Sequence, residues 1–288
     1  MIERGVSLSE KTTYKFGGIA EYYLELTKEN EDQLAKCREL TNDIYILGNG
    51  SNIAFSDRGY PGMIIKAANE QIKLLTGTTL EVNSGSSMPD IARFCYQKGL
   101  TGAEFMIGIP GTIGGGVSMN AGAYGSTIDD ILSSVFSYNF VTSTEREVIK
   151  DKLKFGYRTV EGLDGDYIYK VHLTLELSDK RLIQEKQKEY LAHRKETQPS
   201  GLYNAGSVFK NPKGYYVGEL VERAGLKGYR LGTVSISNKH GNFFVADKMA
   251  KSNDLYNLVQ YVKNIIYKKF TIKLEEEIKF VGDFGKED

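Results

Sequence analysis

The alternation of apolar and polar positions divides the chain into short strands and amphipathic helices. Apolar runs predict strands at 44–47, 53–55, 62–66 and 79–83, and helical spacing predicts helices at 30–40 and 87–98. Ser87 and Asp90 have the spacing of a helix start, and Gly99 follows as the stop of the same helix. Residues 167–177 alternate cleanly, with apolar side chains on one face and His172 on the other. This mixture of periods predicts an α+β fold.

The composition changes near residue 180, where a highly charged helix is predicted over 179–196. A glycine-bearing loop follows, and the later elements expected are a helix at 218–224, a strand at 243–246, a long amphipathic helix at 252–269 and a last strand at 274–281. We therefore expect a first domain over 1–180, itself divided near residue 70, and a smaller second domain over 181–288.

Charge and hydropathy are those of an ordinary globular protein. The 288 residues include 37 basic and 37 acidic side chains, and 41% are hydrophobic. Nucleic-acid binders usually carry a basic excess, so the balanced charge argues against a nucleic-acid partner. No apolar run approaches the roughly 18 residues that span a bilayer, and the polar start Met1–Gly5 lacks a signal-peptide core. We expect a cytoplasmic protein without membrane insertion and without an obligate protein partner.

Cysteine and histidine are sparse. Cys37 and Cys95 each lie in a helical pattern, which predicts two small buried side chains in a reducing compartment. The three histidines are too scattered for a metal cluster, so no metal site is expected. His172 is interpreted as a solvated strand residue, and His240 as mainly structural.

Glycine is the unusual feature of the composition. It makes up 31 of the 288 residues, or about 11% against a typical 7%. Seven glycines fall within residues 108–125 and two more within 48–52. The first loop fails the dinucleotide fingerprint because Ile53 stands at the third glycine position, and no Gly-Lys-Ser/Thr triplet exists for a P-loop. Two neutral glycine-rich loops suggest a dinucleotide or flavin cradled by backbone amides, although 48–52 alone is equally typical of a tight turn.

Several motifs in order resemble the UDP-N-acetylenolpyruvoylglucosamine reductase family. They are Leu47-Gly-Asn-Gly-Ser-Asn52, the segment Gly108–Gly125, Tyr157-Arg158, Ala205-Gly-Ser-Val-Phe-Lys-Asn-Pro212, Ala224-Gly-Leu-Lys-Gly228 and Leu274-Glu-Glu-Glu-Ile278. Each motif is moderately specific, and the ordered set, which covers nearly the whole chain, is highly specific.

The resemblance implies a fold and an activity. It implies an FAD-binding fold of the vanillyl-alcohol-oxidase type in two α/β subdomains, followed by a smaller α+β substrate-binding domain. The implied oxidoreductase reduces enolpyruvyl-UDP-N-acetylglucosamine to UDP-N-acetylmuramate in peptidoglycan precursor synthesis. Hydride passes from NADPH to non-covalent FAD and then to C3 of the nucleotide-sugar substrate. The short connection between Leu177 and Gln198 resembles the family's shorter subtype.

The resemblance also implies three catalytic residues. Arg158 would hold the charge that develops on the substrate carboxylate, a task that suits its planar fork of donors. Ser207 would protonate C2; the competing interpretation is a turn serine that bonds its own backbone. Glu277 would hydrogen-bond the developing enol. If 275–277 is a strand, Glu275 and Glu277 share a face, which excludes Glu276 but leaves the other two open.

Binding residues are expected at two further groups of positions. The cofactor set is Gly48, Asn49, Gly50, Ser51, Asn52, Pro110, Gly111, Thr112, Gly114, Gly115, Asn120, Ala121 and Gly122, and the substrate set is Tyr157, Lys210, Asn211 and Lys239. Neither loop contains His or Cys, so the flavin is expected to be non-covalent. One departure is Val160, where the family usually has Ser. It keeps open a related FAD enzyme with another small acceptor; a non-catalytic nucleotide-sugar binder is a further alternative.

Overall fold

The structure, a computed structural model, describes residues 1–27, 32–163, 165–201 and 203–285. Contacts between residues divide it into two units. The first comprises Met1–Ile2, Leu24–Gly48 and Ile64–Arg194, and the second comprises Glu3–Tyr23, Asn49–Met63 and Lys195–Asp288. Each unit is therefore assembled from segments that are distant in sequence. The linear divisions near residue 70 and after residue 180 stay predictions.

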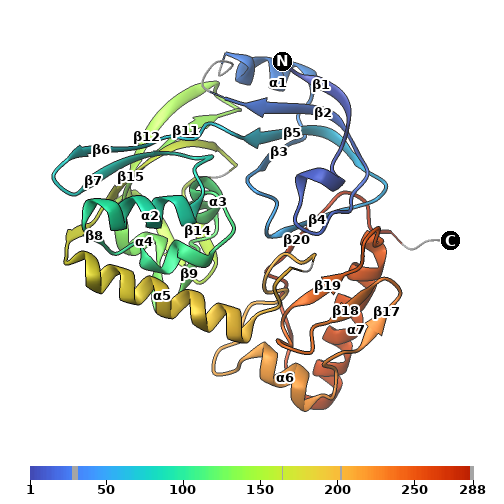
Figure 1. Cartoon of the computed structure of the whole chain (residues 1–288). Coiled ribbons are helices and arrows are strands. Elements are labelled where there is room, and N and C mark those ends of the chain that lie inside the picture. The colour runs from blue at the N-terminus through green and yellow to red at the C-terminus, as the bar shows by residue number, and fades with distance from the viewer. Residues whose placement is uncertain (28–31, 164, 202, 286–288) are drawn as a thin grey trace. The chain divides into compact units, whose positions relative to one another are not determined.

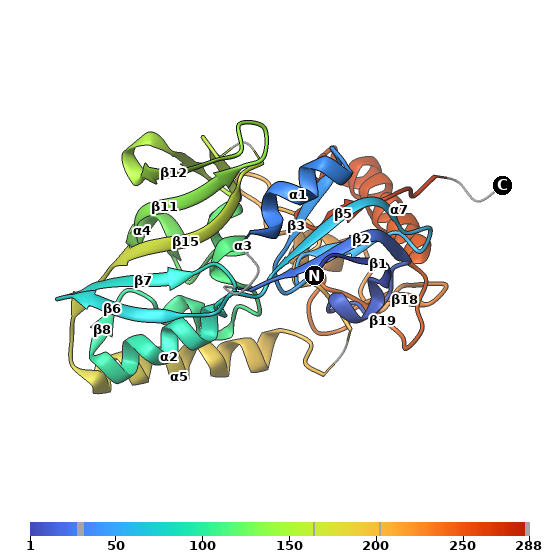
Figure 2. The same ribbon diagram turned by 90° about the horizontal axis from the view of Figure 1, so that it is seen from above.

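A five-stranded antiparallel sheet with the strand order β12-β11-β15-β7-β6 forms the frame of the first unit (Figures 1 and 2). The strands are β6 (Ile72–Thr76), β7 (Thr79–Asn83), β11 (Leu132–Asn139), β12 (Thr144–Ile149) and β15 (Tyr167–Thr174). The alternation predicted over 167–177 is confirmed at Val171, Leu173 and Leu175, which are buried. It is wrong at the two ends, because Ile168 is also buried and Leu177, in the separate strand β16 (Glu176–Leu177), is exposed. His172 lies on the opposite face but is only half-exposed, with its Nε2 atom 3.4 Å from Glu81.

Helices cover one face of this sheet (Figure 1). They include α2 (Met88–Lys98), α3 (Ile113–Ser118), α4 (Ile128–Ile131) and α5 (Lys180–Thr197). The predicted ends of α2 are confirmed: the Ser87 hydroxyl accepts the Asp90 amide, and Gly99 ends the helix with φ 71°. The core between helices and sheet is apolar and includes Leu80, Ile91, Ile113, Val135 and Val171.

Shorter elements complete the first unit. They are α1 (Gln33–Leu40), β3 (Ile44–Leu47), β8 (Leu100–Thr101), β9 (Gly122–Ala123), β10 (Ser126–Thr127), β13 (Lys154–Gly156), β14 (Thr159–Glu161), β16 (Glu176–Leu177) and the 3-10 turns Glu104–Gly108 and Lys150–Lys152. Positions 30 and 31 of the helix predicted at 30–40 lie outside the described residues. Cys37 and Cys95 are free and buried as predicted.

The second unit has its own core. A three-stranded antiparallel sheet, β17 (Arg230–Leu231), β18 (Val234–Ile236) and β19 (Phe244–Ala246), packs with α6 (Val217–Arg223) and α7 (Ser252–Phe270) around Leu220, Val234, Leu258 and Val259 (Figure 1). Strand β4 (Ile53–Phe55) pairs in parallel with β20 (Lys279–Val281). The strand predicted over 274–281 is therefore wrong before residue 279.

A further sheet has the order β1-β2-β5-β3, where β1 is Glu3–Ser7, β2 is Ile19–Leu26 and β5 is Tyr60–Ala67. The chain passes from one unit to the other within β2 and within β5. A 3-10 turn, Ser9–Lys11, follows β1. None of the helices in the described ranges is long and apolar enough to cross a membrane.

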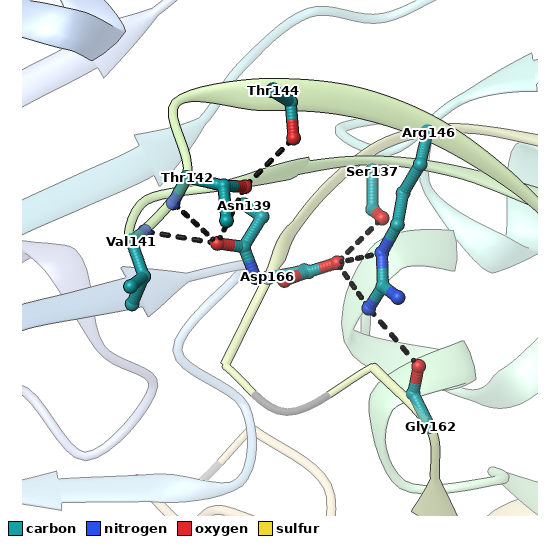
Figure 3. A network of polar contacts seen from close by, with 8 residues as sticks. All are labelled: Ser137, Asn139, Val141, Thr142, Thr144, Arg146, Gly162 and Asp166. Atoms are coloured by element: carbon teal, nitrogen blue, oxygen red, sulfur yellow. Dashed lines mark hydrogen bonds and ion pairs between the residues drawn. The ribbon is translucent and has the colours of Figure 1, made fainter.

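A buried carboxylate organises the turns at one end of the five-stranded sheet (Figure 3). The Asp166 carboxylate accepts hydrogen bonds from Ser137 (2.8 Å), Asn139 (2.7 Å) and Arg146 (2.8 Å). Arg146 also donates to the Gly162 carbonyl oxygen at 3.1 Å. Since Gly162 directly follows β14, this network anchors the chain beside that strand.

Candidate active site

Arg158 lies at the tip of a short hairpin in the first unit. Strands β13 and β14 pair with Gly156 opposite Thr159, so Tyr157 and Arg158 form a two-residue turn. Arg158 has φ 59°, a left-handed conformation that glycine normally supplies. A non-glycine residue held there costs of order 1 kcal/mol, and such outliers concentrate at functional sites.

The arginine side chain points back to the glycine-rich segment. Its Nη2 atom donates to the Gly122 carbonyl oxygen at 3.1 Å, and its guanidinium carbon lies 5.1 Å from the centre of the Tyr157 ring. Arg158 is half-buried, while Tyr157 is 53% exposed. The structure therefore brings Arg158 and Gly122, two predicted site residues, into contact.

Asn120 ties the same segment to the hairpin. Its Nδ2 atom donates to the Gly156 carbonyl oxygen, and its Oδ1 atom accepts the Asp129 amide, both at 3.2 Å. The residue is buried and has φ 44°. Both polar atoms of the predicted cofactor residue thus bond protein groups, and one of these bonds supports the hairpin that carries Arg158.

The amides at the start of α3 are occupied by the protein itself. Ile113 and Gly114 donate to the carbonyl oxygens of Ser86 and Ser84, and Gly115 donates to the Thr112 hydroxyl. These amides do not form the open nest that the sequence suggested. Any cofactor contact along this helix has to use other atoms.

Packing accounts for several glycines of the cluster. A Cβ atom on Gly114 would lie 2.8 Å from Ser84, one on Gly116 3.0 Å from Met88, and one on Gly122 2.6 Å from a backbone oxygen. Gly115 differs, because it is exposed and a Cβ atom there would meet nothing closer than 3.5 Å. Its absent side chain leaves surface that a ligand can approach.

The 48–52 loop is shared by the two units. Gly48 belongs to the first, where a Cβ atom would lie 2.7 Å from the Thr112 hydroxyl, so the two glycine-rich segments are in contact there. In the second unit, Gly50 has φ 62°, and a Cβ atom would lie 2.3 Å from the Lys11 carbonyl oxygen. Ser51 makes no hydrogen bond with any described residue. Its half-buried amide and hydroxyl therefore fit a polar cofactor.

Ser207 and Glu277 lie on paired segments of the second unit. The Glu277 amide donates to the Val208 carbonyl oxygen at 2.8 Å, and a backbone bridge pairs Phe209 with Glu276. Ser207 itself is bridged to Phe243. The two predicted catalytic residues are thus joined through the main chain of the residues beside them.

The Ser207 hydroxyl is available for chemistry. It has no hydrogen-bond partner among the residues that the structure describes, so the turn-serine interpretation is wrong. The turn before it is closed instead by the Asn204 side chain, which accepts the Gly206 amide at 3.1 Å. Gly206 has φ 75°, which explains the glycine at this position.

The first two of the three consecutive glutamates pair with different lysines. Glu275 pairs with Lys210 at 2.5 Å, and Glu276 pairs with Lys263 at 2.7 Å. The Glu277 carbonyl oxygen accepts the Asn52 side chain at 3.0 Å. Residues 275–277 do not form a strand, so the face argument does not apply, and the choice between Glu275 and Glu277 continues to rest on the family resemblance.

The predicted substrate residues also have protein partners. Besides the pairing of Lys210, Asn211 accepts the Val217 amide at 3.0 Å at the start of α6, and the Lys239 ammonium donates to the Lys195 carbonyl oxygen at 2.5 Å. His240 accepts the Asn242 amide through Nδ1 at 3.1 Å. Burial, and then the charge of Lys227, lower the pKa of His240. Sequence reasoning missed Asn242, whose bonds lie beside Ser207.

Thiol and metal chemistry receive no support in the described ranges. Burial raises the pKa of Cys37 to about 11 and that of Cys95 to about 12, so both thiols are protonated near neutral pH. No group of three or more His, Cys, Asp or Glu side chains within these ranges could hold a metal ion.

Family models match both parts of the chain. A model described as an FAD binding domain matches residues 23–149, and one described as the C-terminal domain of UDP-N-acetylenolpyruvoylglucosamine reductase matches residues 198–281. The first match contains both glycine-rich segments. Together with the open surface at Gly115 and the unpaired groups of Ser51, it places the protein among FAD-binding proteins.

Similar proteins identify a particular family within the class of FAD-binding proteins. The UDP-N-acetylenolpyruvoylglucosamine reductase of Desulforamulus reducens is 36% identical over 282 residues, covering 96% of this chain and 92% of the relative. That of Listeria monocytogenes is 36% identical over 279 residues, covering 96% and 93%. The crystal structure of UDP-N-acetylenolpyruvylglucosamine reductase from Thermus caldophilus matches with a TM-score of 0.84 and 33% identity, covering 98% and 99%.

The chain belongs to the UDP-N-acetylenolpyruvoylglucosamine reductase family. The resemblance drawn from the sequence motifs is confirmed, and so is the predicted fold class of a flavin-binding fold followed by a smaller C-terminal domain.

Proposed function

We propose that the protein reduces enolpyruvyl-UDP-N-acetylglucosamine to UDP-N-acetylmuramate with NADPH, in cytoplasmic peptidoglycan precursor synthesis. The observation that carries this proposal is the Ser207 hydroxyl, which lacks a partner among the described residues and follows the turn at Gly206 on a segment paired with that of Glu277. Relatives that align over 96% of the chain are named for this reductase.

FAD is the cofactor that the matched domain binds. When bound, it supplies the hydride acceptor and donor between NADPH and C3 of the substrate. The chain contributes the contacts around it, for which we propose the cofactor set named from the sequence, with Ser51 and Gly115 best supported. No His or Cys occurs in either glycine-rich loop, so the proposed attachment is non-covalent.

In the proposed reaction, residues of the chain stabilise the charge that develops on the substrate and deliver the proton. Addition of hydride to C3 drives negative charge onto C2 and the adjacent carboxylate. We assign Arg158 to that carboxylate, because a fixed guanidinium fork stabilises a developing anion better than solvent does. We assign the proton delivered to C2 to the Ser207 hydroxyl, which regains a proton from solvent. Glu277 would hydrogen-bond the enol oxygen.

Substrate binding is proposed for Tyr157, Lys210, Asn211 and Lys239. The Lys210–Glu275 pair supports this for Lys210, because the Glu275 side chain is 71% exposed. The Lys210 side chain is only 17% exposed, but the exposed carboxylate is solvated when it leaves, so a substrate phosphate can replace it on the lysine.

The proposal is tested by measuring flavin reduction by NADPH and flavin reoxidation by the substrate as separate steps. The purified protein should be yellow, NADPH should bleach it under anaerobic conditions, and enolpyruvyl-UDP-N-acetylglucosamine should restore the colour. UDP-N-acetylglucosamine, which lacks the enolpyruvyl group, is the matched control and should not restore it. Bleaching without recovery would refute the substrate assignment and favour another acceptor, the alternative that Val160 keeps open. Acid precipitation should release the flavin into the supernatant.

A further inference from the structure

The segment that follows Ser207 is held from both sides within the second unit. On one side, the Val208 carbonyl oxygen accepts the Glu277 amide at 2.8 Å. On the other, the Val208 amide donates to the Asn242 carbonyl oxygen at 2.9 Å. Ser207 is therefore attached to a short central segment whose neighbours are the Glu277 segment and the Asn242 segment.

The Asn242 side chain doubles the second of these attachments. Its Oδ1 atom accepts the Phe209 amide at 3.0 Å, and its Nδ2 atom donates to the Phe209 carbonyl oxygen at 2.8 Å. The residue is 3% exposed, so both bonds are shielded from water. A neutral amide offers a donor and an acceptor together, which neither a carboxylate nor a hydrocarbon of this size can do.

We infer that Asn242 is a positioning residue for the protonation step, since its clamp on Phe209 fixes the Ser207 hydroxyl relative to the Glu277 segment. The inference rests on the proposed function. Proton transfer requires a separation of about 2.6–3.2 Å between the heavy atoms, so a shift of the Ser207 backbone by a fraction of an ångström slows this step. Reduction of the flavin by NADPH does not use Ser207 and is unaffected.

Asn242→Asp tests the clamp with almost no change in volume. The new carboxylate can still accept the Phe209 amide, but it cannot donate to the Phe209 carbonyl oxygen and repels it instead. We expect reoxidation of the reduced holoenzyme by enolpyruvyl-UDP-N-acetylglucosamine to slow about 10–100-fold, part of the 10²–10⁴ that general acids contribute. The rate of bleaching by NADPH should stay within about twofold. Both rates are measured per bound flavin by anaerobic stopped flow.

Asn238→Asp is the matched control. Asn238 lies in the same turn, is exposed, and makes no hydrogen bond with any described residue. The same charge change at this position should leave both half-reactions near wild type. Asn242→Ser, which shortens the side chain without adding charge, should also slow only reoxidation.

A double mutant separates positioning from general destabilisation. In a Ser207→Ala background, Asn242→Asp should slow reoxidation by less than about threefold further, because the group that it positions is gone. Equal loss of both half-reactions would overturn the inference. So would full additivity with Ser207→Ala, or failure of both Asn242 variants to fold as holoenzymes, since Asn242 would then serve the fold as a whole. If wild-type flavin is not reoxidised by the substrate, the proposed function fails instead.

Discussion

Arg158 and Ser207 belong to different units and are held in contrasting ways. Arg158 sits at the tip of a hairpin of three-residue strands, in a left-handed conformation, with Asn120 and Gly122 as its supports. Ser207 adjoins a segment whose backbone is bonded on both sides by parts of the chain that lie much later in the sequence. One residue is presented by a local turn, and the other is fixed by long-range pairing.

The contrast matches what each residue is proposed to do. A guanidinium has a long side chain and five donors, so rotations within the side chain can adjust it to a carboxylate. A serine hydroxyl has one rotatable bond beyond its backbone, so its position depends on the backbone itself. If Ser207 is the proton donor, it needs the stiffer support, and variants of each region can test this.

The largest effect is expected for Ser207→Ala. Removal of the proton donor should slow substrate-driven flavin reoxidation by about 10³-fold, within the range for general acids, while bleaching by NADPH remains within about twofold. Anaerobic stopped flow measures both steps. Equal slowing of the two steps would show that Ser207 has been assigned to the wrong half-reaction.

Arg158→Lys should slow the same step by about 10²-fold, because an ammonium keeps the charge but loses the two-pronged contact with a carboxylate. The substrate KM should also rise. If removal of the side chain leaves its space open, Arg158→Ala should bind guanidinium ion and recover part of the rate. A Lys variant with wild-type kinetics would remove the argument for a bidentate contact.

Asp166→Ala tests the anchor beside the Arg158 hairpin. It leaves the buried Ser137 hydroxyl without its acceptor, at about 1–3 kcal/mol for an unsatisfied buried group, and the half-buried Asn139 amide loses the same acceptor. Arg146 is less affected, since 42% of its side chain is exposed and reaches water. We expect a loss of about 2–3 kcal/mol and a Tm lower by roughly 4–8 °C, measured by thermal unfolding. Glu145→Ala, on the exposed face of β12, is the matched control and should change Tm little.

Periodicity predicted the long helices and the regular strands, but it missed β11. Its sequence, LSSVFSYN, places Ser134 and Ser137 at buried positions, where Ser137 donates to Asp166. Two register shifts in its pairing with β15 also move the alternation from one face to the other. Periodicity also did not predict the Arg158 hairpin, because strands of three residues are too short to show a period.

The candidate site was predictable wherever a motif is local. Gly206 before Ser207 indicated a turn with a positive φ, which the structure has, whereas Arg158 came from the family resemblance and nothing beside it indicated its left-handed conformation. Spacing alone could not show that Gly114, Gly116 and Gly122 make room for protein neighbours, because the atoms they accommodate come from other segments. The sequence did not indicate the role of Asn242 for the same reason, since that role depends on pairing with Phe209.

Asn120→Ala distinguishes the two roles that the sequence and the structure suggest for this residue. Loss of its bond to Gly156 should loosen the Arg158 hairpin and raise the substrate KM about tenfold, or about 1.4 kcal/mol. If Asn120 binds the cofactor instead, the dissociation constant of FAD should rise and the KM should change little. Fluorescence titration of the apoprotein with FAD, together with steady-state kinetics, separates the two outcomes. Ser118→Ala, at an exposed position of the same segment, is the control.

The smallest effect concerns the stiffer region and its pH dependence. Burial, and then Lys227, lower the pKa of His240, whose Nδ1 atom accepts the Asn242 amide at 3.1 Å. The folded state therefore favours neutral His240, while the unfolded chain takes up a proton at the ordinary pKa of about 6.5. Stability should be constant above that pH and fall as the pH drops from about 6.5 through the lower folded pKa, by about 1.4 kcal/mol per unit of pKa depression.

Urea unfolding between pH 5 and 8 should show a shallower fall for His240→Gln than for wild type, whereas His193→Gln, at an exposed position, should follow wild type. An unchanged slope in His240→Gln would mean that protonation of His240 does not disturb the support of Ser207.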